Sequence, residues 1–160
     1  MIMAIMERLG GFLSELLPEE EREMVQLGEF RDFARGEVLI KQGESQHGLF
    51  LVLSGSLAVR VDGSMSSTEL SAIKKGESVG EMSVLDPMNA SAWIMGKEPG
   101  HLWCISKSRF DEFLAEHPVA AVKILRAIAI MLCRRLRKTD DKIIRGVEES
   151  LPNVGFEDDY

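Results

Sequence analysis

The sequence predicts a mainly β protein with flanking helices, built as a small antiparallel barrel or jelly roll that is followed by one long helix. From Phe30 to Ile105, apolar residues occur in short runs separated by glycine, which is typical of strands joined by tight turns. From Pro118 onward, apolar residues recur at helical spacing instead. The length of 160 residues and the hydrophobic content of 45% suit one domain with a substantial core rather than two ordinary domains.

The N-terminal region is predicted to hold two helices. The first is indicated by helical spacing of the apolar residues Phe12, Leu13, Leu16 and Leu17. The second begins at Pro18, because proline is tolerated in a first helical turn and the carboxylates of Glu19–Glu21 suit the positive end of the helix dipole. Its apolar face is formed by Met24, Val25 and Leu27.

The central region is predicted to be a series of short strands. The strand candidates are Val38–Ile40, Leu49–Leu53, Leu57–Val61, Leu70–Ile73, Ala92–Met95 and Leu102–Ile105. The Ser-rich connection that runs from Asp62 through Thr68 is typical of a hairpin loop rather than a domain linker. The even spacing of these runs favours a small antiparallel barrel or jelly roll.

Two helices are predicted after the last strand. Ser108 precedes a short helical stretch, and Pro118 opens a longer one that is expected to reach about Glu149. The short stretch carries Phe110, Phe113 and Leu114, and the long one carries Val122, Leu125, Ile128, Ala129, Leu132, Leu136 and Ile143. A helix of this length spans roughly 45 Å, more than a small barrel can cover. The uncovered part predicts a partner, and a second copy of the chain is the simplest one.

Composition and spacing argue against several other functions. The net charge of −7 disfavours broad nucleic-acid binding. The apolar start of the chain lacks the basic residues and cleavage site of a signal peptide, and no apolar window is long enough for a membrane span, so we expect a cytoplasmic protein. Neither the two cysteines, Cys104 and Cys133, nor the three histidines have metal-ligand spacing, so we expect no metal site and two buried, unreactive thiols.

Three stretches, Arg35–Glu44, Leu49–Val59 and Gly80–Ile94, resemble the cyclic-nucleotide-binding domain family in both order and distance. The resemblance implies a jelly-roll (double-stranded β-helix) barrel with N-terminal helices in residues 1–117. It also implies a dimerisation helix in residues 118–149 and movement of that helix at a hinge near Phe110–Pro118 when ligand binds. Residues 150–160 are then an acidic tail, and we expect no DNA-binding domain.

The third stretch is similar to the family's phosphate-binding cassette. Residues matched to the ligand site are Gly80, Glu81, Met82, Ser83, Ala90, Ser91 and Thr139. The resemblance implies that Gly80, Met82 and Ser83 line a cradle of main-chain amides for the cyclic phosphate, that Glu81 accepts from the ribose 2′-hydroxyl, and that Ser91 supports the phosphate. Thr139 corresponds to a position that contacts the base; the alternative is a threonine on a helix face with no ligand.

The cassette departs from the family pattern at Ala90, where the family has an arginine. The segment from Glu77 to Asn89 contains three carboxylates and no lysine or arginine to replace that cation. Losing one charge-assisted hydrogen bond costs about 1.5 to 3 kcal/mol, or about one to two powers of ten in affinity. Amides at a helix start still attract a phosphate, so weak binding remains open.

Two functions therefore compete, and an enzyme is not expected. The first is a stand-alone, dimeric regulatory module that acts through a protein partner and has weakened or lost its affinity for cyclic nucleotides. The alternative is a working sensor of cyclic AMP or cyclic GMP that relies on backbone amides, Glu81 and Ser91. The sequence offers no nucleophile paired with a base and no catalytic pair of carboxylates.

Overall fold

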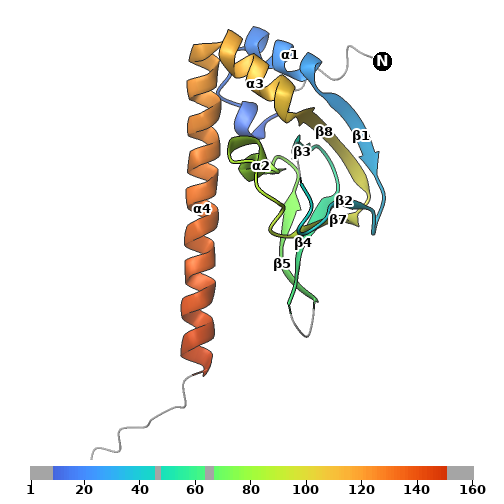
Figure 1. Ribbon diagram of the computed structural model, residues 1–160, viewed down its shortest axis with the longest axis vertical. Helices are drawn as coiled ribbons and strands as arrows, with labels where there is room; N and C mark the ends of the chain where they lie inside the picture. Colours follow the sequence, from blue (N-terminus) through green and yellow to red (C-terminus); the bar gives the residue numbers. More distant parts are fainter. Residues whose placement is uncertain (1–8, 46–47, 64–66, 151–160) are drawn as a thin grey trace, which may run out of the picture. The chain divides into compact units, whose positions relative to one another are not determined.

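A computed structural model describes residues 9–45, 48–63 and 67–150 of the chain (Figure 1). The strands are β1 (Glu29–Phe33), β2 (Val38–Ile40), β3 (Gly48–Val52), β4 (Ser56–Asp62), β5 (Ser67–Lys74), β6 (Ser78–Val79), β7 (Trp93–Glu98) and β8 (Gly100–Ser106). The helices are α1 (Pro18–Leu27), α2 (Glu81–Leu85), α3 (Lys107–Glu116) and α4 (Pro118–Ser150). The apolar chain start, the middle of the Ser-rich connection and the acidic tail lie outside the described residues.

The strands form two four-stranded antiparallel sheets, in the orders β1-β8-β3-β6 and β2-β7-β4-β5. Both sheets contribute buried side chains to one apolar cluster, which contains Phe33, Ile40, Phe50, Val52, Leu57, Ile73, Val79, Ile94 and Leu102. Phe50 and Val52 of β3, two residues apart, both point into this cluster. The predicted jelly-roll barrel is confirmed.

All six predicted strands are present, and two further strands complete the sheets. β1 has the sequence Glu-Phe-Arg-Asp-Phe, of which only Phe33 is buried, so it lacks the apolar alternation that marks a strand in sequence. It forms because it pairs along its length with β8, from Glu29 opposite Cys104 to Phe33 opposite Gly100. β6 has only two residues and is held by β3.

The first predicted helix is wrong: the chain there forms only a 3₁₀ turn over Gly11–Leu13. Gly10 and Gly11 have φ angles of 75° and 60°, which lie outside the right-handed α-helical range. Leu17, which precedes a proline, is extended with ψ of 153°. The apolar side chains still pack, since Phe12, Leu13 and Leu16 are buried.

The second predicted helix is confirmed as α1, which begins at Pro18. Glu20 reaches back to its start, where its Oε2 accepts a hydrogen bond of 2.8 Å from the main-chain N–H of Leu17. Met24 is fully buried on the inner face, as predicted. Figure 1 shows α1 and α3 together at one end of the barrel, and the two helices are in contact.

Helix α3 begins at Lys107, earlier than the sequence predicts, because Ser106 rather than Ser108 caps it. The Ser106 hydroxyl accepts a hydrogen bond of 3.4 Å from the main-chain N–H of Arg109. The side chains of Phe110 and Phe113 are fully buried, so α3 packs its predicted apolar face. The helix ends at Glu116, and α4 begins two residues later.

The long helix is confirmed, since α4 extends over 33 residues. Its first part, through Ala127, belongs to the compact unit Met1–Ala127, whereas the rest belongs to a second unit, Ile128–Tyr160. In the first unit, Ala120, Ala121 and Ile124 of α4 are buried. No helix among the described residues is both long enough and apolar enough to cross a membrane.

Candidate functional site

The first half of the cassette is the short helix α2, which begins directly after Gly80. Gly80 has a φ of 92°, and a Cβ atom at this position would lie 2.2 Å from the carbonyl oxygen of Gly48 in β3. Only glycine therefore combines this left-handed conformation with this close approach. No side-chain hydrogen bond caps the start of α2, and the first amides of a helix have no acceptor within the helix.

The side chains of α2 divide between the interior and the surface. Glu81 and Ser83 are buried, with 2% and 8% of their surface exposed. The Met82 side chain is 61% exposed. The helix thus combines a glycine start with a buried carboxylate.

The second half of the cassette is held by the turn after β2. The N–H of Ala90 donates to the carbonyl of Glu44 at 2.9 Å, and the N–H of Gly43 donates to the carbonyl of Ala90 at 2.8 Å. Ser45 and Asn89 form a bridge beside them. These bonds fix the backbone of Ala90, and its methyl group packs against the apolar cluster of the barrel. Position 90 therefore faces the barrel core, and an apolar side chain occupies it.

The segment that follows leads into β7. Ser91 is exposed. The Trp93 side chain is half-buried, and its Nε1 donates to Asp62 Oδ2 at 2.8 Å. Neither Met88, which is 69% exposed, nor Trp93 is a member of the apolar cluster.

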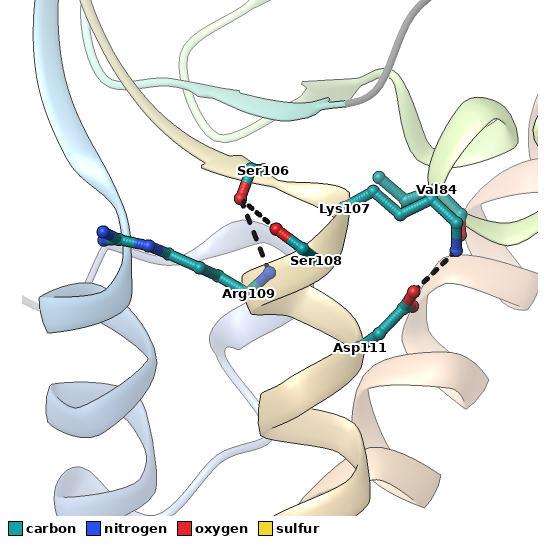
Figure 2. Close-up of polar contacts among 6 residues, drawn as sticks. All are labelled: Val84, Ser106, Lys107, Ser108, Arg109 and Asp111. Atoms are coloured by element: carbon teal, nitrogen blue, oxygen red, sulfur yellow. Dashed lines mark hydrogen bonds and ion pairs between the residues drawn. The ribbon is translucent and has the colours of Figure 1, made fainter.

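A cation does contact the cassette, but it comes from a different element. Lys107, the first residue of α3, donates from Nζ to the carbonyl of Val84 at 2.9 Å and to Asp111 Oδ2 at 2.8 Å (Figure 2). Val84 lies near the C-terminal end of α2, whereas an anion would be held at its start. Sequence reasoning missed Lys107, because 23 residues separate it from Val84 and no spacing rule connects them.

Thr139 belongs to the second compact unit, and the six cassette residues belong to the first. Its side chain is exposed, and its hydroxyl donates to the carbonyl of Arg135 at 3.1 Å. A threonine that bonds to the preceding turn of its own helix is common without any ligand. This bond agrees with the alternative reading of Thr139 as a helix-face residue.

Reactive groups are sparse in the described parts of the chain. There, no set of three or more histidine, cysteine or carboxylate side chains is arranged to hold a metal ion. Cys104 is half-buried beside the barrel core, and burial raises the pKa of its thiol. The raised pKa favours the protonated, unreactive form of the thiol. Cys133 is exposed, so the prediction of a buried thiol is wrong there.

Comparisons with known proteins agree with this architecture. A family model described as a cyclic nucleotide-binding domain matches residues 30–117, more than half of the chain. The chain therefore belongs to the cyclic nucleotide-binding domain family, as the sequence predicted. It has the fold of the regulatory modules of that family.

Three similar proteins illustrate the match. Glutaminase 2 of Bradyrhizobium diazoefficiens is 29% identical over 131 residues, which cover 82% of this chain and 20% of that protein. The cAMP-activated global transcriptional regulator CRP of Escherichia coli is 29% identical over 107 residues, 66% of this chain and 49% of the regulator. A cyclic nucleotide-binding domain from Methylobacillus flagellatus has a TM-score of 0.78 at 24% identity, over 96% of this chain and 85% of that one. The chain thus spans about half or less of the two sequence relatives.

Proposed function

We propose that the protein is a dimeric regulatory module of the cyclic nucleotide-binding family whose affinity for cyclic nucleotides is weakened or lost. The observation that carries the proposal is the environment of Ala90, whose methyl group packs on the apolar core at the position that the family's arginine occupies. No catalytic role is part of the proposal. The output is a contact with a protein partner.

The energetic argument rests on charge. A cyclic phosphate bound at the start of α2 would meet main-chain amides and the buried carboxylate of Glu81, with Lys107 engaged at the opposite end of the helix. Removing one charge-assisted hydrogen bond lowers affinity by about one to two powers of ten. A module that binds at micromolar concentration with its arginine would then need ligand at about ten to a hundred times that level.

A working sensor of cyclic AMP or cyclic GMP is the second candidate. Two observations favour it: α2 begins at a left-handed glycine with no side-chain cap, and Glu81 is buried within the same helix. Backbone amides can hold a phosphate at a helix start without an arginine. In that case Glu81 and Ser91 would supply the remaining polar contacts.

Thermal melting with ligand separates the two candidates. The natural protein, Ala90→Arg and Ala90→Met are each melted with cyclic AMP and with cyclic GMP at millimolar concentration, because a ligand that binds only the folded state raises its stability. We expect ligand to stabilise Ala90→Arg alone, by about 2.7 kcal/mol if it is present at a hundred times its Kd. Ala90→Met controls for side-chain length without charge.

Each other outcome has a defined meaning. Stabilisation of the natural protein would favour the sensor and overturn the proposed loss of affinity. Equal stabilisation of the Arg and Met variants would show that length rather than charge restores the site. If ligand stabilises none of the three proteins, Ala90 does not account for the loss of binding. The proposal that the missing arginine causes that loss would then be wrong.

The proposal of a dimer is supported by exposed apolar residues in the second unit. Leu136 and Ile143 are 63% and 60% exposed, and together with Leu132 and Thr139 they repeat at alternating spacings of four and three residues. This is the spacing of a coiled-coil seam. An exposed apolar stripe on a helix favours association, and a parallel pairing of two α4 helices buries identical stripes against each other.

Sedimentation equilibrium tests the dimer directly. We expect the natural protein to be a dimer at micromolar concentration and Leu136→Glu to be a monomer, since two carboxylates would meet across the seam. Arg134→Glu adds the same carboxylate outside the seam and should remain dimeric. A monomeric natural protein would refute the dimer while leaving the interpretation of the cassette unaffected.

A further inference from the structure

The C-terminal end of α2 is held by a side chain from α3. Figure 2 shows the Lys107 side chain reaching to Val84 and Asp111, with Nζ distances of 2.9 Å to the Val84 carbonyl and 2.8 Å to Asp111 Oδ2. The Lys107 side chain is 28% exposed, and Val84 is buried. This contact is therefore partly shielded from water, and it joins the cassette to the helix that precedes α4.

The contact satisfies an end of α2 that the helix cannot satisfy itself. α2 contains only five residues, and its last main-chain bond runs from the N–H of Asp86 to the carbonyl of Met82. The last carbonyls of any helix lack partners within the helix and carry partial negative charge. A lysine ammonium is well suited to such a carbonyl. Lys107 of α3 thus caps the C-terminal end of α2.

The same turn of α3 holds the end of a second helix. Arg109 donates from Nη1 to the carbonyl of Leu27, the last residue of α1, at 2.9 Å. The Ser106 hydroxyl accepts from the N–H of Arg109 and lies 3.1 Å from the Ser108 hydroxyl, which shapes the turn (Figure 2). One turn therefore holds both the cassette helix and the N-terminal helix by bonds of the same kind.

We propose that Lys107 is a positioning residue that transmits movement of α2 to α3 and on to the first turns of α4, through Ala127. Arg109 connects α3 to α1 through its bond to the Leu27 carbonyl. The path continues through Phe113 and His117, whose rings stack at 4.5 Å between centroids at the junction of α3 and α4. The regulatory meaning of this link rests on the proposed function, in which α2 is the helix that a ligand contacts once position 90 carries an arginine.

The first test needs no ligand. Amide hydrogen exchange is compared between the natural protein, Lys107→Met and Arg109→Met, which each lose one side-chain bond from the same turn. We expect Lys107→Met to speed exchange in the peptide covering α2 about tenfold and to leave α1 unchanged. Arg109→Met should affect the C-terminal end of α1 and leave α2 as it was. Equal exchange of α2 in all three proteins would overturn the proposal.

Rescue separates a positioning role from a general loss of stability. Lys107→Arg keeps a cation that reaches a carbonyl, and it should return α2 exchange to within about twofold of the natural protein. If Lys107→Met does not fold, Lys107→Gln replaces it in the same comparison. An arginine variant that exchanges as fast as the methionine variant would contradict the proposed bond to Val84.

The second test measures transmission in the Ala90→Arg background with cyclic AMP. We expect Ala90→Arg to show ligand-dependent protection both in α2 and in residues 107–127. Adding Lys107→Met should preserve the ligand-induced rise in melting temperature but reduce the protection of residues 107–127 at least about threefold. Undiminished protection in the double variant would refute transmission through Lys107.

The two tests fail independently. If Ala90→Arg binds no cyclic nucleotide, the proposed function fails, while the ligand-free comparison still decides whether Lys107 holds α2. If Ala90→Arg binds but Lys107→Met changes nothing, the proposed function stands and the link through Lys107 is rejected.

Discussion

Two helix starts in the first compact unit, those of α1 and α2, are built in opposite ways. α1 begins with a proline and three glutamates, and the carboxylate of Glu20 bonds back to the N–H of Leu17. α2 begins at Gly80 with no side-chain cap, and its entry is shaped by the Gly48 carbonyl of a neighbouring strand. The start of α1 is therefore satisfied by local sequence, whereas α2 depends on tertiary neighbours at both of its ends.

The two starts therefore differ in what satisfies their main-chain amides. At the start of α1, the carboxylate of Glu20 already accepts a main-chain hydrogen bond. The start of α2 has no side-chain cap, and in the proposed function it is the end of the helix that a cyclic phosphate would meet. Substitutions at each start measure how much each contributes to the free energy of unfolding.

The largest effect is expected at the start of α2. Gly80→Ala must adopt a left-handed conformation and place a Cβ atom where the Gly48 carbonyl now lies, so we expect a loss of about 3 kcal/mol in the free energy of unfolding. Gly76→Ala is the matched control, because Gly76 has a φ of 83° but open space where a Cβ atom would lie. It should cost about 1 kcal/mol. Urea unfolding measures both, and equal losses would show that the close approach to Gly48 is unimportant.

A smaller effect is expected at the start of α1. Glu20→Gln keeps the shape of the side chain but replaces a charged acceptor with a neutral one, so we expect a loss of about 1 kcal/mol at neutral pH. A loss as large as that of Gly80→Ala would contradict the view that α2 has the more demanding start. The same urea series provides the comparison.

The loss in Glu20→Gln should depend on pH with a definite sign. The hydrogen bond from Leu17 and the nearby Lys123 hold the pKa of the Glu20 carboxyl below its ordinary value. A lowered pKa in the folded state contributes stability above the ordinary value and loses it as the pH falls through the lowered one. The stability difference between natural protein and variant should therefore shrink on acidification. A constant difference across that range would contradict the assigned charge.

The ion pair beside this start is expected to contribute less. Lys123 Nζ lies 3.0 Å from Glu20 Oε2, and the two side chains are 29% and 16% exposed. Lys123→Met retains most of the stem and should cost about 0.5 kcal/mol, decreasing as salt is added. A salt-independent loss would point to packing of the lysine stem instead.

The smallest effect is expected at Met82, whose side chain is 61% exposed on α2. Met82→Gln should change the free energy of unfolding by less than about 0.5 kcal/mol. Since the proposed cradle uses only the main chain of this residue, the variant should bind like its parent in the Ala90→Arg background. Isothermal titration calorimetry provides that comparison, and a large loss of affinity would assign a role to the side chain.

The sequence predicts a helix or strand of this protein when the residues within that element are enough to stabilise it. Apolar runs such as Leu49–Leu53 predict strands, and Pro18 with the glutamates that follow it predicts a helix, because each pattern stabilises the element that contains it. β1 escaped prediction because its residues are mostly exposed and polar, and the strand exists through pairing with β8. The helix predicted near Phe12 does not form, since the chain makes only a 3₁₀ turn there and Leu17 is held extended before Pro18.

The residues of the cassette show the same division. Motif and order along the chain were enough to indicate the family, the barrel, the long helix and the missing arginine at position 90, since each depends on residue identity and periodicity. The packing of Ala90 on the core, the exposure of Met82 and the bond from Lys107 to Val84 arise only when distant segments meet. Such contacts have no sequence period, because the partners lie on different elements and only the folded structure brings them together.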